Sequence, residues 1–205
     1  MTPNKEDYLK CIYEIGTEMQ KITNKEIAAR MQVSPPAVTE MIKRMKSENL
    51  ILKDKENGYL LTDIGLKLVS ELYRKHRLIE VFLVHHLDYT SDQIHEEAEV
   101  LEHTVSDLFV ERLDKLLGFP QTCPHGGTIP AEGELLVEIN NLPLAAVQEA
   151  GTYLLTRVHD SFELLKYLEK HAIHIGDQLQ VKQFDSFSNS FTLVNKDEDL
   201  QVSMD

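Results

Sequence analysis

The chain has 205 residues, of which 42% are hydrophobic, which suffices for a substantial core and argues against a disordered protein. No apolar run approaches the ~20 residues that a membrane-spanning helix needs, and the charged segment MTPNKEDYLK is unlike an export signal, so we expect a cytoplasmic protein without a membrane partner. Two cysteines are too few for a disulfide framework and fit a reducing compartment.

The formal net charge of −13 is distributed unevenly along the chain. Residues 1–77 hold 14 Lys and Arg against 11 Asp and Glu, a balance of +3, whereas residues 78–205 hold 7 against 23, a balance of −16. The overall acidity argues against a nucleic-acid partner. Residues 1–77, however, carry a positive balance of charge and could bind DNA. The second part carries carboxylates that attract cations, and five of the nine histidines fall between His76 and His103.

Residues up to about 47 predict three short helices. Leu9 and Ile12 give the first helix an apolar face, and Thr23 with Glu26 forms a capping box that opens the second helix. After the turn QVS, Ser34 is placed to cap the third helix. Apolar residues in that helix recur at spacings of three and four, which predicts one buried stripe and an opposite polar row suited to reach base edges and phosphates.

A hairpin is predicted next, in the segment LILKDKENGYLLT. The pair Asn57-Gly58 favours a two-residue type I′ turn, with Lys53 and Lys55 at its tip. Two short helices, a tight turn and a lysine-tipped hairpin in this order predict a winged helix-turn-helix, with an unrelated helical domain as the alternative. The candidate DNA-contacting residues of the polar row and hairpin are Thr39, Glu40, Lys43, Arg44, Lys53 and Lys55.

Two long helices are expected after the hairpin. The first runs from about Asp63 to Leu87 and places His76 and Glu80 one turn apart on one face. Such a pair is more often part of a solvated helix surface than of a binding site. The second is expected to run as one helix over Ser91–Leu117, with an apolar seam at heptad-like spacing.

A row of carboxylates and imidazoles lies beside that seam, made of His95, Glu99, Glu102 and His103, within an arc of ~100°. Neighbouring half-buried carboxylates repel each other, so the row needs a cation. Either a metal ion or Lys and Arg side chains from elsewhere can supply the charge. Carboxylates with imidazoles suit Mn²⁺ and Fe²⁺ better than thiolate-rich sets do, and Asp7 is a further candidate ligand.

The segment Phe119–Gly133 predicts a linker, because it holds three of the seven prolines and three of the nine glycines. After it, a helical stretch near Ser161–His171 and the β-like runs LQVKQF and SFTLV predict a small α+β module. The fold class is therefore mainly α with an appended α+β module.

Four stretches of the chain carry a resemblance to a known family: EDYLKCIYEI, NKEIAARMQVSPPAVTEMIKRM, KHRLIEVFL and IHEEAEVLEHTVSDLFVERLDKLLG. The chain resembles the DtxR/MntR family of metal-dependent repressors over essentially its whole length, and within it the manganese-responsive streptococcal SloR/ScaR type. The resemblance implies a homodimer that binds a palindromic double-stranded DNA operator and represses metal-uptake genes when metal is bound, with no small-molecule substrate. It also implies a winged helix-turn-helix in residues 1–72, a helical dimerisation and metal-binding domain with linker in 73–140, and an SH3-like, FeoA-type module in 141–205.

The resemblance also implies particular site residues. Its DNA-contacting positions add Ser34, Pro36 and Ala37 to the set above. Its primary metal site corresponds to Asp7, Glu99, Glu102 and His103, and its secondary site to a subset of His76, Glu80, His95, Cys123, His125 and Asp160. Mn²⁺ is the favoured cofactor, Fe²⁺ stays open, and Zn²⁺ can substitute in vitro.

Two departures from the family pattern matter. Relatives that hold two manganese ions carry a Glu where this chain has Lys10, so we predict one metal at the primary site. The family continues past a segment like DLQVSMD, so we expect a truncated module. The alternative function is a winged-helix repressor controlled by an organic ligand. A metalloprotease is disfavoured, because HEEAE has Glu99 where HExxH requires a second histidine.

Overall fold

The structure is a computed structural model that describes residues 2–18, 21–90, 93–139, 142–159, 161–195 and 198–203. The chain forms two compact units. The first comprises residues 1–79, 98–121 and 129–137, and the second comprises residues 80–97, 122–128 and 138–205. In the described part of the chain, no helix combines the length and the apolar character that crossing a membrane requires.

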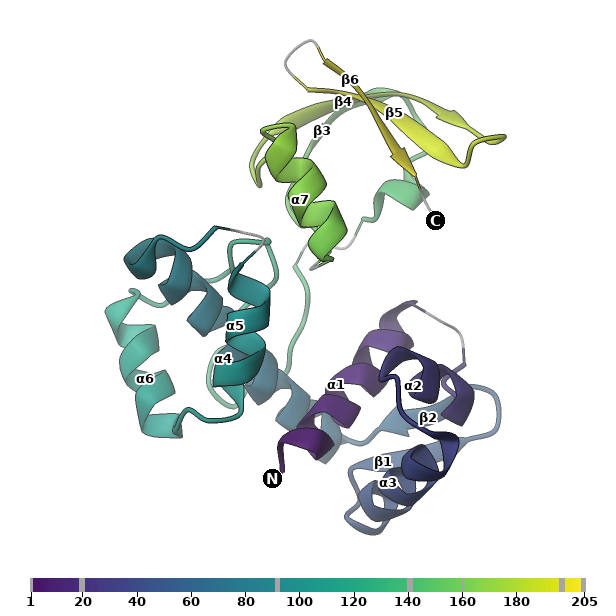
Figure 1. The fold of residues 1–205 in the computed structure, drawn as a ribbon, viewed down its shortest axis with the longest axis vertical. Coiled ribbons are helices and arrows are strands. Elements are labelled where there is room, and N and C mark those ends of the chain that lie inside the picture. Colours follow the sequence, from purple (N-terminus) through teal and green to yellow (C-terminus); the bar gives the residue numbers. More distant parts are fainter. Residues whose placement is uncertain are drawn as a thin grey trace. The chain divides into compact units, whose positions relative to one another are not determined.

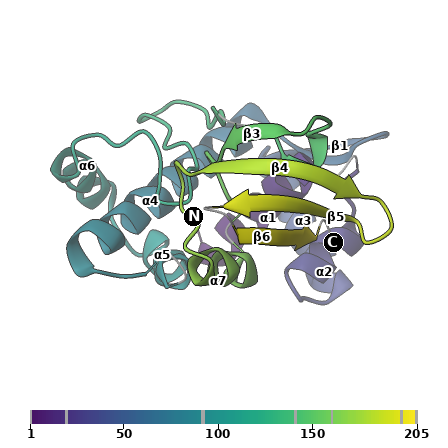
Figure 2. The ribbon, with the colours of Figure 1, turned by 90° about the horizontal axis from the view of Figure 1, so that it is seen from above.

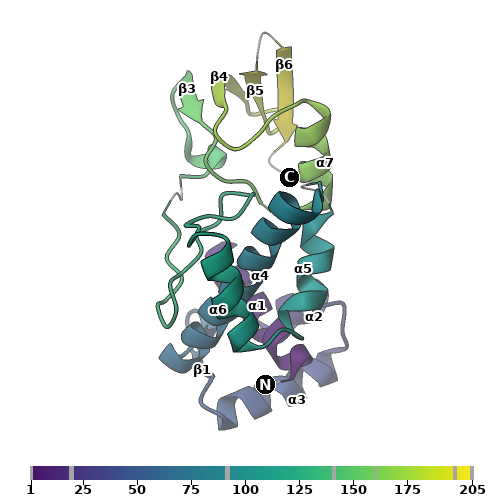
Figure 3. The same cartoon turned by 90° about the vertical axis from the view of Figure 1, so that its left-hand side faces the viewer.

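Three helices and a hairpin make up the N-terminal part of the first unit (Figures 1 and 3). They are α1 (Pro3–Glu18), α2 (Asn24–Arg30), α3 (Pro35–Ser47), β1 (Ile51–Asp54) and β2 (Gly58–Leu61). Thr23 and Glu26 form the predicted capping box, and the Ser34 side chain caps α3 by accepting a hydrogen bond from Ala37 N. The predicted winged helix-turn-helix is confirmed. Its core contains Leu9, Ile12, Ile15, Ile22, Ile27, Val38, Ile42, Met45, Leu50 and Ile51.

The hairpin turn differs from the predicted two-residue turn. Asp54 pairs with Gly58, so three residues form the turn. Asp54 Oδ1 accepts hydrogen bonds from the backbone nitrogens of Glu56 (2.9 Å) and Asn57 (2.8 Å), which stabilises this longer turn. Gly58, and not Asn57, has the positive φ, +83°. Lys55 consequently lies in the turn, whereas Lys53 lies in β1.

Gly58 also joins the hairpin to the chain ahead of α2. Ile22 N donates to Asn57 O (2.8 Å), and Tyr59 N donates to Ile22 O (3.1 Å). A Cβ atom at position 58 would lie 1.9 Å from Ile22 O. A glycine is therefore required there for close approach as well as for its φ angle.

The helices after the hairpin are partly as predicted. Helix α4 spans Asp63–Leu87, as expected. The single helix expected over Ser91–Leu117 is wrong, because the structure has two helices, α5 (Ile94–Glu102) and α6 (Asp107–Leu116). Its expected start at Ser91 lies outside the described residues.

Local polar groups explain the break between α5 and α6. The Thr104 hydroxyl donates to Leu101 O (3.0 Å), and Ser106 caps α6 by accepting from Phe109 N (3.2 Å). The expected apolar seam consequently ends with α5, and Leu108 beyond it is 61% exposed.

A buried ion pair fixes α6 to α4 within the first unit. Arg74 Nη2 lies 2.6 Å from Asp114 Oδ2, and Arg74 Nη1 donates to Pro130 O (3.1 Å). Arg74 and Asp114 are both nearly inaccessible to solvent. Three chain segments that are distant in sequence are thus held to one guanidinium.

The second unit contains the predicted α+β module. Its elements are η1 (Leu144–Ala146), β3 (Gly151–Leu154), α7 (Phe162–Lys170), β4 (Gln178–Asp185), β5 (Ser190–Asn195) and β6 (Glu198–Ser203). The strands form one antiparallel sheet in the order β3-β4-β5-β6 (Figure 2). Leu168 of α7 packs against the sheet core, which includes Val181, Phe191 and Leu193.

Candidate metal centres and DNA-binding surface

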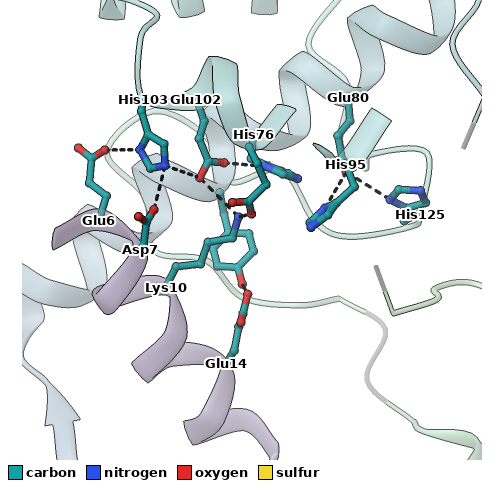
Figure 4. A network of polar contacts seen from close by, with 12 residues as sticks. Glu6, Asp7, Lys10, Glu14, His76, Glu80, His95, Glu102, His103 and His125 are labelled. Carbon is teal, nitrogen blue, oxygen red and sulfur yellow. Dashed lines mark hydrogen bonds and ion pairs between the residues drawn. The ribbon is translucent and has the colours of Figure 1, made fainter. Parts of the chain in front are cut away.

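One candidate metal site lies where α1 meets the C-terminal end of α5 (Figure 4). His103 Nε2 lies 2.9 Å from Asp7 Oδ1 and 3.6 Å from Glu102 Oε1. One ligand atom from each of these three residues lies within 4.8 Å of the others, which is close enough to share one cation. We call Asp7, Glu102 and His103 the helix cluster. Burial raises the pKa of the Asp7 carboxyl, although the charge of His103 opposes the shift.

Lys10 lies beside the helix cluster. Its ammonium forms a close ion pair with Glu99 and lies 3.4 Å from Glu102 Oε1. Burial lowers the pKa of Lys10, but the charges of Glu102 and Glu99 outweigh this effect, so the pKa is raised and the group stays charged. A lysine was one of the two expected sources of positive charge for the row that contains Glu99 and Glu102. Lys10 supplies this charge to Glu99, and in part to Glu102.

His76, expected in the secondary site, contacts the helix cluster. Its Nδ1 atom lies 2.5 Å from Glu102 Oε2 (Figure 4). His76 is 2% exposed and Glu80, one turn later on α4, is fully buried. A solvated helix surface is therefore the wrong explanation for this pair.

A second candidate site lies in the second unit and consists of Glu80, Cys123 and His125, which we call the loop cluster. Ligand atoms of these residues lie within 4.8 Å of one another, and His125 Nδ1 is 3.3 Å from Glu80 Oε1. All three are buried. His95 Nδ1 lies 4.0 Å from Glu80 Oε1. Asp160 lies outside the described residues.

A tight turn positions the two loop residues of the loop cluster. Gly126 N donates to Cys123 O and Cys123 N donates to Gly127 O, both at 2.9 Å. The turn is closed further by the antiparallel bridge between Thr122 and Thr128. This turn brings the thiol and the imidazole of a Cys-x-His segment to the same carboxylate.

The nine residues expected to contact DNA are all exposed in the first unit: Ser34, Pro36, Ala37, Thr39, Glu40, Lys43, Arg44, Lys53 and Lys55. Seven lie at the N-cap or on the open face of α3. The Thr39 hydroxyl donates to Pro35 O (3.0 Å) and accepts from Asn24 Nδ2 (3.0 Å), which orients it. Arg44 Nε lies 3.5 Å from Glu40 Oε1, so these two side chains partly neutralise each other.

Glu6 was not predicted from the sequence as a site residue. Its Oε2 atom lies 2.6 Å from His103 Nδ1. The two residues are 97 positions apart, and the sequence signal that could have identified Glu6 is its place next to Asp7 in an acidic pair on the first helix.

Comparison with known proteins assigns each part of the chain. Residues 1–59 match the iron dependent repressor N-terminal DNA binding domain, residues 62–131 its metal binding and dimerisation domain, and residues 142–205 the FeoA domain. The solved structure of ScaR with bound Zn²⁺ has 63% sequence identity and a TM-score of 0.93, covering 98% of this chain and 94% of that chain. The chain belongs to the iron-dependent repressor family.

Other members of the family are also similar to this chain. The manganese regulator SloR has 60% identity and a TM-score of 0.88, covering 99% of this chain and 94% of that chain. The iron-dependent repressor IdeR of Mycobacterium tuberculosis is 33% identical over 153 residues, 75% of this chain and 65% of IdeR. The diphtheria toxin repressor of Corynebacterium diphtheriae is 32% identical over 155 residues, 75% of this chain and 69% of that repressor.

These matches confirm the resemblance seen in the sequence, including its streptococcal-type branch. The family consists of metal-dependent transcriptional repressors and not of enzymes, as predicted. Its DNA-binding and dimerisation domains accord with DNA and a second copy of the chain as partners. Solved relatives are described as manganese-activated or with bound Zn²⁺ or Cd²⁺, which supports a metal cofactor without selecting one.

Proposed function

We propose that this chain is a repressor that binds its operator as a homodimer when the helix cluster holds a divalent cation, with Mn²⁺ as the main candidate. The observation that carries the proposal is that Asp7 and His103 lie 2.9 Å apart. Asp7 belongs to the region matching the DNA-binding domain and His103 to the region matching the metal binding and dimerisation domain. A shared cation would therefore link these two functional regions.

The donor atoms of the helix cluster fit such a cation. Two carboxylates and one imidazole form a set of oxygen and nitrogen ligands, which suits Mn²⁺ and Fe²⁺. The cation would supply positive charge beside the half-buried Asp7, whose carboxyl pKa is raised by burial. Fe²⁺ is the second candidate, and Zn²⁺ can substitute in vitro.

The cation would act as a corepressor through differential affinity. Asp7 lies on α1, which packs against α2 and β2 of the winged helix-turn-helix. Holding Asp7 against Glu102 and His103 favours one placement of α1, and thereby the spacing of the two DNA-binding domains in a dimer. A hundredfold preference of the cation for the DNA-competent arrangement corresponds to about 2.7 kcal/mol.

We also propose that the helix cluster and its neighbour Glu99 hold one metal ion and not two. The ammonium of Lys10 lies against Glu99 and Glu102, where it supplies the positive charge that a second metal would otherwise bring. The test is to count bound Mn²⁺ in a Cys123→Ser, His125→Ala variant, which lacks two ligands of the loop cluster. One ion per chain is expected, and two ions would refute the proposal.

The exposed face of α3 and the hairpin form the proposed operator-binding surface. Pro36 and Ala37 can contact thymine methyl groups in the major groove, while Lys43 and Arg44 can reach phosphates. By resemblance to the family, the controlled genes would include those for metal uptake.

The decisive experiment uses a DNA duplex selected from a random pool by the Mn²⁺-loaded protein. Fluorescence anisotropy with this duplex is then measured during titration with Mn²⁺, Fe²⁺ and Zn²⁺. We expect high affinity with Mn²⁺ and at least a hundredfold weaker binding in a chelator. Equal affinity in the chelator, together with no stoichiometric Mn²⁺ binding by calorimetry, would refute the metal switch and favour the organic-ligand alternative.

A further inference from the structure

We propose that Glu6 is a positioning residue that orients the imidazole of His103 for metal binding. The inference rests on the proposed function, because it concerns a ligand of the same helix cluster. It assigns a role to a side chain that would not itself touch the cation.

The geometry places Glu6 behind the His103 ring. Glu6 Oε2 lies 2.6 Å from Nδ1, while the other ring nitrogen, Nε2, faces Asp7 Oδ1 at 2.9 Å and Glu102 Oε1 at 3.6 Å (Figure 4). The two nitrogens of one ring thus have separate partners. Nε2 points to the ligand atoms and Nδ1 points to Glu6.

With a cation bound between Nε2 and Asp7, this arrangement would favour the tautomer that a metal needs. A neutral imidazole carries its proton on one nitrogen and can bind a metal only through the other. A carboxylate that accepts a hydrogen bond from Nδ1–H keeps the proton there and leaves the Nε2 lone pair available. The negative charge of Glu6 also makes the ring a stronger donor to a cation.

The position of His103 in the chain explains why it benefits from such a partner. α5 ends at Glu102, so His103 lies in the turn after the helix. A side chain in a turn has less help from neighbouring helical turns in selecting its rotamer than one inside a helix. The Glu6 contact supplies that restraint, and it leaves the side chain of His103 only 12% exposed.

Glu6 and Asp7 are consecutive residues of α1, so a movement of this helix affects both of their contacts with His103. The His103 ring is held on one nitrogen by Glu6 and faces Asp7 with the other. A shift of α1 relative to the end of α5 would therefore disturb the ligand geometry and the ring orientation together.

The test compares Mn²⁺ affinity by calorimetry in the Cys123→Ser, His125→Ala background. We expect Glu6→Ala to weaken binding by about 10- to 100-fold, the loss typical of an outer partner of a metal-binding histidine. Glu6→Gln, whose amide oxygen can still accept from Nδ1–H, should recover most of the affinity. The matched control is Lys5→Ala, which removes an ion pair with Glu48 (2.6 Å) one residue away and should leave affinity unchanged.

Two further measurements test whether Glu6 orients the His103 ring or only stabilises the fold. In a His103→Ala background, Glu6→Ala should cause no additional loss. In ¹⁵N spectra of the Cd²⁺-loaded protein, His103 should coordinate through Nε2 in the unmodified chain and show a mixture of states in Glu6→Ala. If Glu6→Ala does not fold, the spectrum of Glu6→Gln is used in its place. Coordination of Cd²⁺ through Nε2 is then expected, and coordination through Nδ1 would refute the inference.

The outcomes distinguish this inference from the proposed function. If His103→Ala leaves Mn²⁺ affinity intact, the proposed metal site itself is wrong. If His103→Ala weakens Mn²⁺ binding measurably, only the role of Glu6 is refuted when Glu6→Ala causes no loss of affinity, or causes the same loss in the His103→Ala background as in the presence of His103.

Discussion

The helix cluster and the loop cluster are built from similar side chains but differ in donor chemistry and surroundings. The helix cluster has two carboxylates and an imidazole, and a charged lysine lies beside it. The loop cluster replaces one carboxylate with the thiol of Cys123 and is buried throughout. A thiolate favours softer metals such as Zn²⁺, whereas oxygen-rich sets suit Mn²⁺.

The difference indicates how one small protein can separate two tasks. The helix cluster includes Asp7 of α1, so a cation bound there would influence the DNA-binding domain. The loop cluster takes two of its three residues from one tight turn, so its occupancy would mainly hold that turn in place. Four substitutions test this division.

The largest effect is expected from Glu102→Gln in the helix cluster. Glu102 is buried and lies between His76, Lys10 and His103, so this substitution would alter a central residue of the proposed site. We expect Mn²⁺-dependent operator affinity to fall at least a hundredfold, about 2.7 kcal/mol, as measured by anisotropy. The control is Glu97→Gln, an exposed position on the same helix, which should bind normally. Retained Mn²⁺ dependence would show that the helix cluster is not the switch.

Lys10→Met should have two effects of opposite sign. The metal-free protein should lose about 3 kcal/mol of stability, because Glu99 and Glu102 lose a buried cation. Mn²⁺ affinity should rise severalfold, because the ion no longer competes with an ammonium. Thermal unfolding in chelator and calorimetry measure the two effects, with Lys5→Met as the control. A fall in both quantities would mean that Lys10 supports the metal site and does not compete with it.

Cys123→Ser sharpens the contrast in donor chemistry. We expect Zn²⁺ affinity at the loop cluster to fall about tenfold, since a hydroxyl is a poorer ligand than a thiolate. Mn²⁺ affinity at the helix cluster, measured in the same variant, should not change and serves as the internal control. An equal loss of affinity for Zn²⁺ and Mn²⁺ would contradict the proposed difference between the clusters.

The smallest effect is expected from His95→Ala, because the three residues whose ligand atoms lie within 4.8 Å of one another in the loop cluster are Glu80, Cys123 and His125. We expect less than a threefold change in Zn²⁺ affinity by calorimetry, compared with a larger loss in His125→Ala. A loss as large as that of His125→Ala would place His95 among the ligands of the loop cluster.

Sequence patterns predicted those features that depend on neighbouring residues. The Thr23 capping box, the Ser34 cap and the limits of α4 follow from local hydrogen bonding and hydrophobic period. The break after Glu102 was missed because a regular apolar period outweighed the signal from Thr104 and Ser106.

The candidate sites could be predicted only in part. Spacing and resemblance predicted Asp7, Glu102 and His103 as ligands, and the structure brings these three residues together. The contacts of Glu6 with His103 and of His76 with Glu102 depend on how α1 and α4 pack against α5. Such contacts join residues 97 and 26 positions apart, which no local period encodes.

The backbone hydrogen bonds between Ile22 and the hairpin have a mechanical consequence for DNA recognition. They attach the wing to the segment that leads into α2, and the space at Gly58 is too small for any side chain. The wing is therefore not an independent arm that can search for phosphates. Because α3 also contacts α2 and β1, we expect the wing and α3 to approach a DNA duplex together.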